Sequence, residues 1–469
     1  MSGRLPAAAA LARAAEATRF ESSPAAVRRR VVFLVSDVLA TMVSACRRDE
    51  IVRARASLSV GGGPSTVAGS HHSADPATAA LLNGLSVAAE QLQDGHRHGR
   101  GHPASHVVPA VLAVAESNGA TGESMLSAVL AGYEVGVRIG IAMGGTPDGV
   151  HDIATWGTVG AAAGVAHLLA DGSAGTVAAA IELAASAPLL PDAATVFGGA
   201  TGQHAFLGMG AHLGVVWGSL AAGGLRAPAG TLERHFGRWA GRSFDPSLVA
   251  EAVAPEGGWS DHAVLGGYVK RHPTCAHLHG VNDAVEDILD RWEGVREGIE
   301  SVLVETYAGA AAFDDPEPPN DLAARFSIPY TVAVALVTGH LDNTSFQSPW
   351  FEDGRVRSLA RRVEVRHRRE LDARYPGGRP ALVTVRLRKG EPMRAEAFVP
   401  RGDGVDALDD ADVIDKPRRL LVSRVPERRA DELLAAVRDL ADTGVAPLTV
   451  ALRQLFDEGR EGKPAADSE

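Results

Sequence analysis

The sequence predicts a mainly α-helical protein: a large all-helical domain with a smaller α+β lid domain inserted near the C-terminal end. Two observations support this fold class. Apolar residues recur at helical spacing through most of the first 265 residues. After Lys270 the pattern changes to short, alternating runs rich in β-branched side chains, which indicate half-buried strands. A chain of 469 residues is long enough to bury a full core in two or three domains.

The predicted helices follow one another from residue 23 onward. In the first, over residues 23–45, apolar residues from Val31 to Met42 recur three or four positions apart, and Ser23-Pro24 supplies the start. Similar patterns predict helices over residues 105–116, 122–143, 158–170 and 174–187.

A further predicted helix, over residues 204–223, carries three glycines on one face. Gly210, Gly214 and Gly218 are spaced four residues apart. Each glycine costs a helix about 1 kcal/mol relative to alanine. We therefore expect this face to pack closely against a neighbouring helix.

The lid domain is predicted over residues 268–405. Its expected strands cover residues 301–307, 362–367, 381–387 and 394–399, with helical segments near residues 279–292 and 329–339. Residues 1–267 form the first part of the helical domain, and residues 406–460, with a helical pattern over 429–458, are expected to return to it. The polar tail at residues 461–469 is predicted to be disordered.

Composition excludes several function classes. The net charge is −11 and no stretch forms the basic face that a nucleic-acid binder needs, so nucleic acid is not an expected partner. Two cysteines are too few for a disulfide framework or a zinc ribbon. The apolar N-terminal run is interrupted by Arg13 and Glu16, unlike a signal peptide, and residues 205–222 are too rich in glycine and polar residues for a good membrane span. We expect a cytoplasmic protein without a membrane partner.

Three polar clusters interrupt the helical patterns and are candidates for chemistry. The first, at residues 91–103, is too glycine-rich for a helix; it combines acids, histidines and arginines, which can exchange protons and bind carboxylates. Its members are Asp94, His96, Arg97, His98, Arg100 and His102. A solvated polar loop is the alternative. A metal site formed by His96, His98 and His102 is disfavoured because the ligand spacing is loose.

The second cluster is centred on His151, which precedes a helix predicted to begin near Thr158. The positive end of that helix would lower the pKa of the imidazole and favour the neutral base. A buried histidine hydrogen-bonded at a helix entry is the alternative.

The third cluster, at residues 270–279, contains Lys270, Arg271 and Cys275. The chain has four lysines, and Lys270 is the first of them, so residues 1–269 contain none. A basic linker between domains is the alternative interpretation.

In this order, these clusters and their surroundings resemble the MmgE/PrpD family, which includes 2-methylcitrate dehydratases and cis-aconitate decarboxylases. The resemblance runs from about residue 24 to residue 432. The matching segments are LLNG at 81–84, HPASHVVPAVLAVAE at 102–116, AGYEVGVRIG at 131–140, the glycine-rich run that follows His151, the stretch from Lys270 to Asp283, and FSIPY at 326–330.

The resemblance implies a homodimer with an active site between a helical domain and an α+β lid. It also implies chemistry on small di- or tricarboxylates without a metal or an organic cofactor. Carried over by position, His102, His151, Lys270 and Tyr330 match active-site positions of the family, and Cys275 matches a further pocket position.

Two departures from the family pattern concern the substrate. Gln91 stands where the family has the first aspartate of an acidic run, of which Asp94 survives, and Gln203 stands where the family has a lysine. The first change removes a base, and the second removes a fixed positive charge that would hold a carboxylate. We therefore do not expect the protein to use 2-methylcitrate as a substrate in the binding geometry that is usual for the family.

The predicted function is a cofactor-independent lyase, dehydratase-like, that abstracts a proton alpha to a carboxylate or carbonyl of a small polycarboxylate. His151 or His102 would be the base, Lys270 would stabilise the developing enediolate-like charge or anchor a carboxylate, and Asp94 or Tyr330 would protonate a leaving hydroxyl. The predicted substrate-binding residues are Gln91, His96, Arg97, Gln203, Arg271 and Cys275. An epimerase, isomerase or decarboxylase on the same scaffold and a non-catalytic ligand-binding protein are the alternatives.

Overall fold

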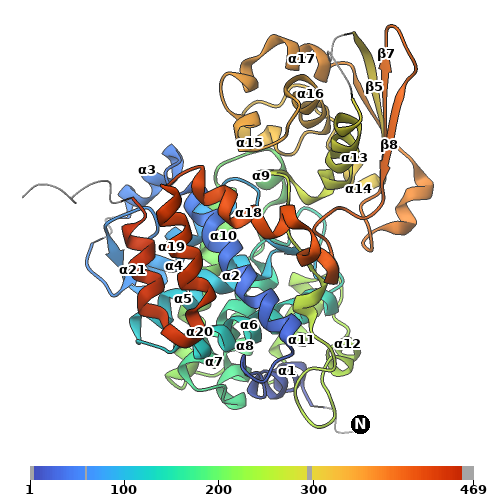
Figure 1. Cartoon of the computed structure of the whole chain (residues 1–469). Helices are drawn as coiled ribbons and strands as arrows, with labels where there is room; N and C mark the ends of the chain where they lie inside the picture. Colours follow the sequence, from blue (N-terminus) through green and yellow to red (C-terminus); the bar gives the residue numbers. More distant parts are fainter. Residues whose placement is uncertain (1–4, 59–60, 293–297, 457–469) are drawn as a thin grey trace, which may run out of the picture.

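A computed structural model describes residues 5–58, 61–292 and 298–456 of the chain (Figure 1). It has a large helical body and a smaller part in which helices cover a β-sheet, so the predicted fold class is confirmed. The tail predicted to be disordered, residues 461–469, lies outside the described residues.

The helical body is built around helix α7. This helix packs against four others, because its small residues allow close approach on every side. A Cβ atom placed on Gly214 of the helix α10 would lie 2.4 Å from the Cβ of Ala161, which confirms the close packing predicted for that glycine face. The five helices are α5 (Pro103–Ser117), α6 (Gly122–Ala142), α7 (Thr155–Leu169), α8 (Ala174–Ser186) and α10 (Gln203–Ala222).

Further helices complete the body. The C-terminal helices pack against α2, α5 and α6, beside the N-terminal half of the chain (Figure 1). The remaining N-terminal helices are α1 (Ala7–Glu16), α2 (Ala25–Ala45), α3 (Asp49–Ser57), α4 (Pro76–Ala88), α9 (Ala193–Phe197), α11 (Thr231–His235) and α12 (Pro246–Glu251). The C-terminal ones are α18 (Ala411–Val422), α19 (Glu427–Arg438), α20 (Leu440–Thr443) and α21 (Val445–Gln454).

Within the part of the chain that the structure describes, two helices, α6 and α10, are long and apolar enough to cross a membrane by length and composition. The most apolar window of α6 is 94% buried, and α10 packs along α4 and α7. Both are therefore packed helices of the body.

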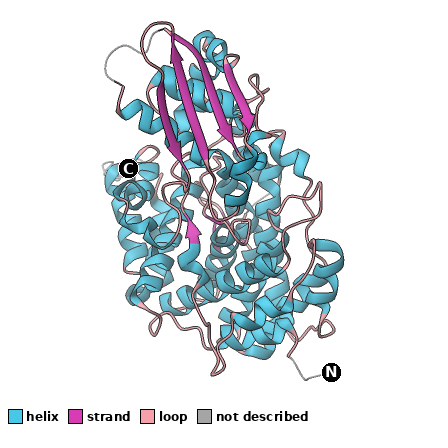
Figure 2. Cartoon of the chain, turned by 90° about the vertical axis from the view of Figure 1, so that its right-hand side faces the viewer, coloured by secondary structure: helices cyan, strands magenta, loops and turns pink. Residues whose placement is uncertain are grey.

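The lid contains a four-stranded sheet in the order β6-β5-β7-β8, in which β5 and β6 are parallel and the other pairs antiparallel. The residues of β5 and β7 alternate in burial, so one face of the sheet packs on helices (Figure 2). The strands are β5 (Ile299–Thr306), β6 (Val363–His367), β7 (Ala381–Leu387) and β8 (Met393–Ala397). The helices are α13 (His279–Asp290), α14 (Ala308–Ala311), α15 (Asp321–Ala324), α16 (Ile328–Thr338) and α17 (Gly354–Ala360).

The two chain segments that connect the body to the lid lie side by side. The entering segment includes the strand β4 (Gly267–Tyr268), which pairs with β3 (Gly95–His96) in the histidine-rich loop. On its other side, Tyr268 bridges to Asp403 of the returning segment. This arrangement brings the first and third polar clusters of the sequence together at the junction of body and lid.

Candidate active site

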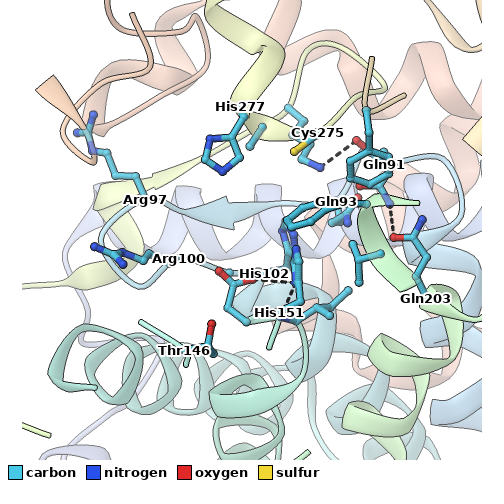
Figure 3. Close-up of a pocket in the computed structure, with 18 of the residues that line it drawn as sticks. Gln91, Gln93, Arg97, Arg100, His102, Thr146, His151, Gln203, Cys275 and His277 are labelled. Carbon is cyan, nitrogen blue, oxygen red and sulfur yellow. Dashed lines mark hydrogen bonds and ion pairs between the residues drawn. The ribbon is translucent and has the colours of Figure 1, made fainter. Parts of the chain in front are cut away.

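A cavity of about 170 Å³ lies at this junction. Its walls come from the loop before α5, the loop before α7, the start of α10, the entering segment and the lid (Figure 3). The predicted site residues that line it are Gln91, Arg97, His102, His151, Gln203, Lys270 and Cys275. The structure thus brings together side chains that are up to 184 positions apart in the sequence, from Gln91 to Cys275.

His102 is the residue immediately before helix α5. Its Nδ1 atom lies 2.5 Å from the carbonyl oxygen of Asp94. Because a carbonyl oxygen can only accept, Nδ1 carries the hydrogen, and Nε2 of the neutral ring keeps a free lone pair. Burial, followed by the charge of Lys270, lowers the pKa of His102 well below its usual value. The ring is therefore neutral near pH 7.

His151 has the opposite arrangement of ring nitrogens. Its Nδ1 accepts a hydrogen bond from the backbone N–H of Ile153 at 3.0 Å and lies 3.1 Å from Oδ1 of Asp152. The neutral ring therefore carries its hydrogen on Nε2, and the protonated ring has one there as well. Burial lowers the pKa of His151 and raises that of Asp152. His151 thus offers an N–H donor from Nε2.

Lys270 is 1% exposed, and its Nζ donates to the backbone carbonyl of Gln91 at 3.1 Å. Burial lowers the pKa of Lys270 to about 7. The ammonium group therefore loses its proton within the physiological pH range, unlike an exposed lysine.

Three arginines line the cavity beside these groups: Arg97, Arg100 and Arg379. Arg97 and Arg379 both approach Asp403, at 3.4 Å and 3.8 Å. The carboxylate offsets one of the two charges through these ion pairs, without a hydrogen bond to either guanidinium group. The guanidinium of Arg100 lies over the ring of Tyr375, 5.8 Å from its centroid. This part of the cavity is suited to a carboxylate.

Two predicted site residues of the histidine-rich loop lie outside the cavity, as structural groups. The carboxylate of Asp94 accepts from the backbone N–H groups of Ala104 and Ser105, both at 2.9 Å, and so caps α5. The Nδ1 atom of His96 accepts from the N–H of Gly99 at 3.0 Å and closes a turn. Neither fits the role predicted for it, as leaving-group acid or substrate ligand, because the hydrogen bonds of the loop point these side chains inward.

Tyr330 and Arg271 also lie outside the cavity. The hydroxyl of Tyr330 donates to the carbonyl of Ser345 at 2.6 Å, inside the lid. Arg271 directs its guanidinium away from the neighbouring Lys270, to Glu286 at 2.7 Å, because successive residues of an extended segment face opposite sides. The predictions of Tyr330 as an acid and of Arg271 as a substrate ligand do not fit this placement.

The histidines His96, His98 and His102, considered above as a metal set, do not meet as ligands. Within the described residues, the side chains whose potential ligand atoms do lie together are His272, Asp283 and Glu286. The guanidinium of Arg271 already pairs with both carboxylates of that group.

Several lining residues were missed by the sequence interpretation: Gln93, Asp152, Tyr268, His277, Phe326, Tyr375 and Arg379. His277 lies within the third cluster, residues 270–279, but was not named as a candidate there, and Tyr268 lies two residues before that cluster. Tyr375 and Arg379 come from the lid about a hundred residues later, and no local pattern marks them.

The cavity between the helical body and the lid thus combines two histidines with complementary ring nitrogens, a buried lysine and three arginines, and it has the composition of an enzyme active site. Residues 9–248 match the model of the MmgE/PrpD N-terminal domain and residues 272–442 that of the MmgE/PrpD C-terminal domain. The chain belongs to the MmgE/PrpD family.

Two curated relatives show the kind of enzyme to which the chain is similar. Cis-aconitate decarboxylase of Aspergillus terreus (strain NIH 2624 / FGSC A1156) is 26% identical over 412 residues, which cover 80% of each chain. The cis-aconitate decarboxylase-like protein oryM of Aspergillus oryzae (strain ATCC 42149 / RIB 40) is 26% identical over 416 residues, 81% of this chain and 82% of the relative. At the family level they support a lyase-like enzyme.

Proposed function

We propose that the protein is a cofactor-independent lyase that abstracts a proton alpha to a carboxylate or carbonyl of a small carboxylate substrate and then expels water. The observation that carries this proposal is the pairing of nitrogens in one cavity. His102 presents a lone pair at Nε2, and His151 presents an N–H at Nε2. One histidine can accept a proton while the other donates one.

In the proposed elimination, Nε2 of His102 takes the α-proton, and the C–H electron pair moves into an enediolate. The Lys270 ammonium stabilises the negative charge that develops on the substrate carboxylate. The enediolate then collapses to a carbon–carbon double bond as the β-hydroxyl leaves. His151 gives its Nε2 proton to that hydroxyl, which departs as water, while Asp152, whose pKa is raised by burial, passes its proton to Nδ1 at 3.1 Å, so that the ring stays neutral and Asp152 is left as the carboxylate.

A decarboxylase is the second candidate, and the names of the two relatives favour it. In that reaction carbon dioxide leaves first, and the electron pair of the broken C–C bond remains on the substrate. The N–H of His151 could protonate that carbanion, so the same cavity serves both reactions.

Product analysis on a panel of small hydroxylated di- and tricarboxylates and their unsaturated counterparts tests the proposal. Elimination produces an alkene that absorbs in the near ultraviolet without release of carbon dioxide. Carbon dioxide release would instead establish the decarboxylase, and inversion at carbon without either change would establish an epimerase. Tight binding without turnover of any compound would contradict a catalytic role.

A further inference from the structure

One end of the cavity is lined by the side chains of three glutamines. Gln91, Gln93 and Gln203 lie on one side of the two histidines, whereas Arg97 and Arg100 lie on the other (Figure 3). Gln93 and Gln203 are 1% and 0% exposed. Their amide groups therefore have little access to bulk water and depend on partners within the cavity.

The orientation of the Gln203 amide follows from its neighbours. The Nε2 of Gln91 donates to the carbonyl of Ala88 at 3.1 Å, and that carbonyl can only accept. The same Nε2 faces Oε1 of Gln203 at 3.3 Å, so the Gln203 oxygen must point toward Gln91. The Nε2 group of Gln203 is left as a donor.

This donor and a nearby acceptor lack partners. Among the described residues, no group forms a hydrogen bond with Nε2 of Gln203 or with Oε1 of Gln93, and both atoms are buried. Buried polar groups in native proteins are almost always paired. Two unpaired atoms of opposite kind in the wall of one cavity indicate that a ligand supplies the missing partners.

We propose that the substrate places a carboxylate at the arginine end and an uncharged group that both donates and accepts, a primary amide, at the glutamine end. The amide oxygen would accept from Nε2 of Gln203, and the amide N–H would donate to Oε1 of Gln93. A carboxylate in that position would have no hydrogen for Gln93 and would set two acceptor oxygens against each other. This proposal names the substrate class for the proposed lyase and rests on it.

Lys270 is the fourth cation that lines the cavity, beside the three arginines. Its Nζ is tied to the backbone of Gln91 rather than to a glutamine side chain, so it is available to the carboxylate at the reacting carbon. A dicarboxylic acid monoamide matches the groups that line the cavity: one carboxylate would pair with the arginines, a second with Lys270, and the neutral amide with the glutamine side chains.

Isothermal titration calorimetry with propane-1,2,3-tricarboxylate and its terminal monoamide tests the proposal. Both compounds are saturated and lack a leaving group, so binding is measured without turnover. We expect the wild-type protein to bind the monoamide about tenfold more tightly, because the tricarboxylate leaves the acceptor of Gln93 unpaired. Equal affinities, tighter binding of the tricarboxylate, or binding of neither compound would overturn the proposal.

Two variants test whether Gln203 causes the preference for the monoamide. Gln203→Met keeps the volume of the side chain and should abolish the preference for the monoamide, whereas Gln203→Lys should reverse it in favour of the tricarboxylate. Gln454→Lys adds the same charge at the exposed end of α21 and should leave the ratio unchanged. A ratio that does not respond to Gln203→Met would contradict the assignment, and circular dichroism would show that the variant is folded.

The titration tests the ligand assignment and the activity assay tests the proposed lyase, so either proposal can fail without the other. If the monoamide preference is found but no compound of this class is turned over, the proposed lyase falls and the ligand assignment stands. If elimination is observed on tricarboxylates with no preference for the amide, the ligand assignment falls and the lyase stands.

Discussion

The backbone around each histidine decides which ring nitrogen reaches the cavity. The carbonyl of Asp94 fixes Nδ1–H of His102, and the N–H of Ile153 fixes the lone pair of Nδ1 in His151. A shared motif position cannot show this difference, because it depends on which backbone group each ring meets. The sequence therefore predicted both histidines as candidates but left their roles open.

Lys270→Met tests the charge at the centre of the site. The substitution keeps the length of the side chain and removes the ammonium, so turnover should fall by about 100-fold or more. Because the pKa of Lys270 is lowered to about 7, wild-type kcat/KM should decline as the pH rises through about 7, as the ammonium loses its proton. The variant should lack that decline. Steady-state kinetics between pH 5.5 and pH 9 measure both effects.

The stability of the same variant serves as its control. Unfolded Lys270 holds its proton to about pH 10.5, whereas the folded protein releases it near pH 7. Burial of the charged form therefore costs stability below pH 7, and this cost disappears as the pH rises toward 10.5. Lys270→Met should thus be at least as stable as the wild type at pH 6. Full activity of a folded variant would contradict the role of Lys270.

At the scale of elements, helix boundaries decide how the site is formed. Helix α7 begins at Thr155, three residues before the predicted start, and α5 begins at Pro103 rather than Ser105. Proline is favoured in the first turn of a helix, where its missing N–H costs no hydrogen bond. The earlier start places His102 at the N-cap position of α5, while the carboxylate of Asp94 accepts the capping hydrogen bonds.

Asp94→Asn tests whether this helix start positions His102. The NH2 group of asparagine would face one of the two backbone N–H groups that now donate hydrogen bonds to the carboxylate, so one of these bonds would be lost. The free energy of unfolding should therefore fall by about 1–2 kcal/mol. Because the backbone of the same residue holds Nδ1 of His102, kcat should fall while KM changes little. Chemical denaturation and steady-state kinetics measure the two effects.

Asp75→Ala is the matched control. Asp75 also caps a helix, α4, because its Oδ1 accepts from the N–H groups of Ala77 and Thr78, but it lies at an exposed position away from the cavity; alanine removes this acceptor. This variant should lose stability without losing kcat. An equal loss of kcat in both variants, or in neither, would contradict the positioning role of Asp94.

For the whole molecule, the alternation of helical and strand patterns was sufficient to predict a helical body and an α+β lid. The contribution of the lid to the site was not predictable in the same way. Tyr375 and Arg379 lie in a segment whose local sequence marks no chemistry, and they reach the cavity because the lid closes over the loop before α5. Conversely, Tyr330 occupies a matching motif position but packs inside the lid. The homodimer and the cytoplasmic location stay predictions.

Exhaustive chelation tests the proposed cofactor independence of the whole protein. The proton transfers assigned above use His102, His151 and Lys270, so activity should survive dialysis against EDTA and 1,10-phenanthroline. Elemental analysis of the active protein should find less than about one-tenth of an equivalent of zinc or iron. Loss of activity that a single metal restores would contradict the proposal.

The most direct test of the account is exchange of the substrate α-proton, followed by proton NMR in deuterium oxide. A saturated substrate analogue without a leaving group separates proton abstraction from elimination. We expect the wild-type protein to exchange the α-proton and His102→Asn to exchange it at least about 100-fold more slowly. His151→Asn should retain exchange on the analogue but lose elimination on the true substrate. Exchange at the wild-type rate in folded His102→Asn would contradict the assignment of His102 as the base.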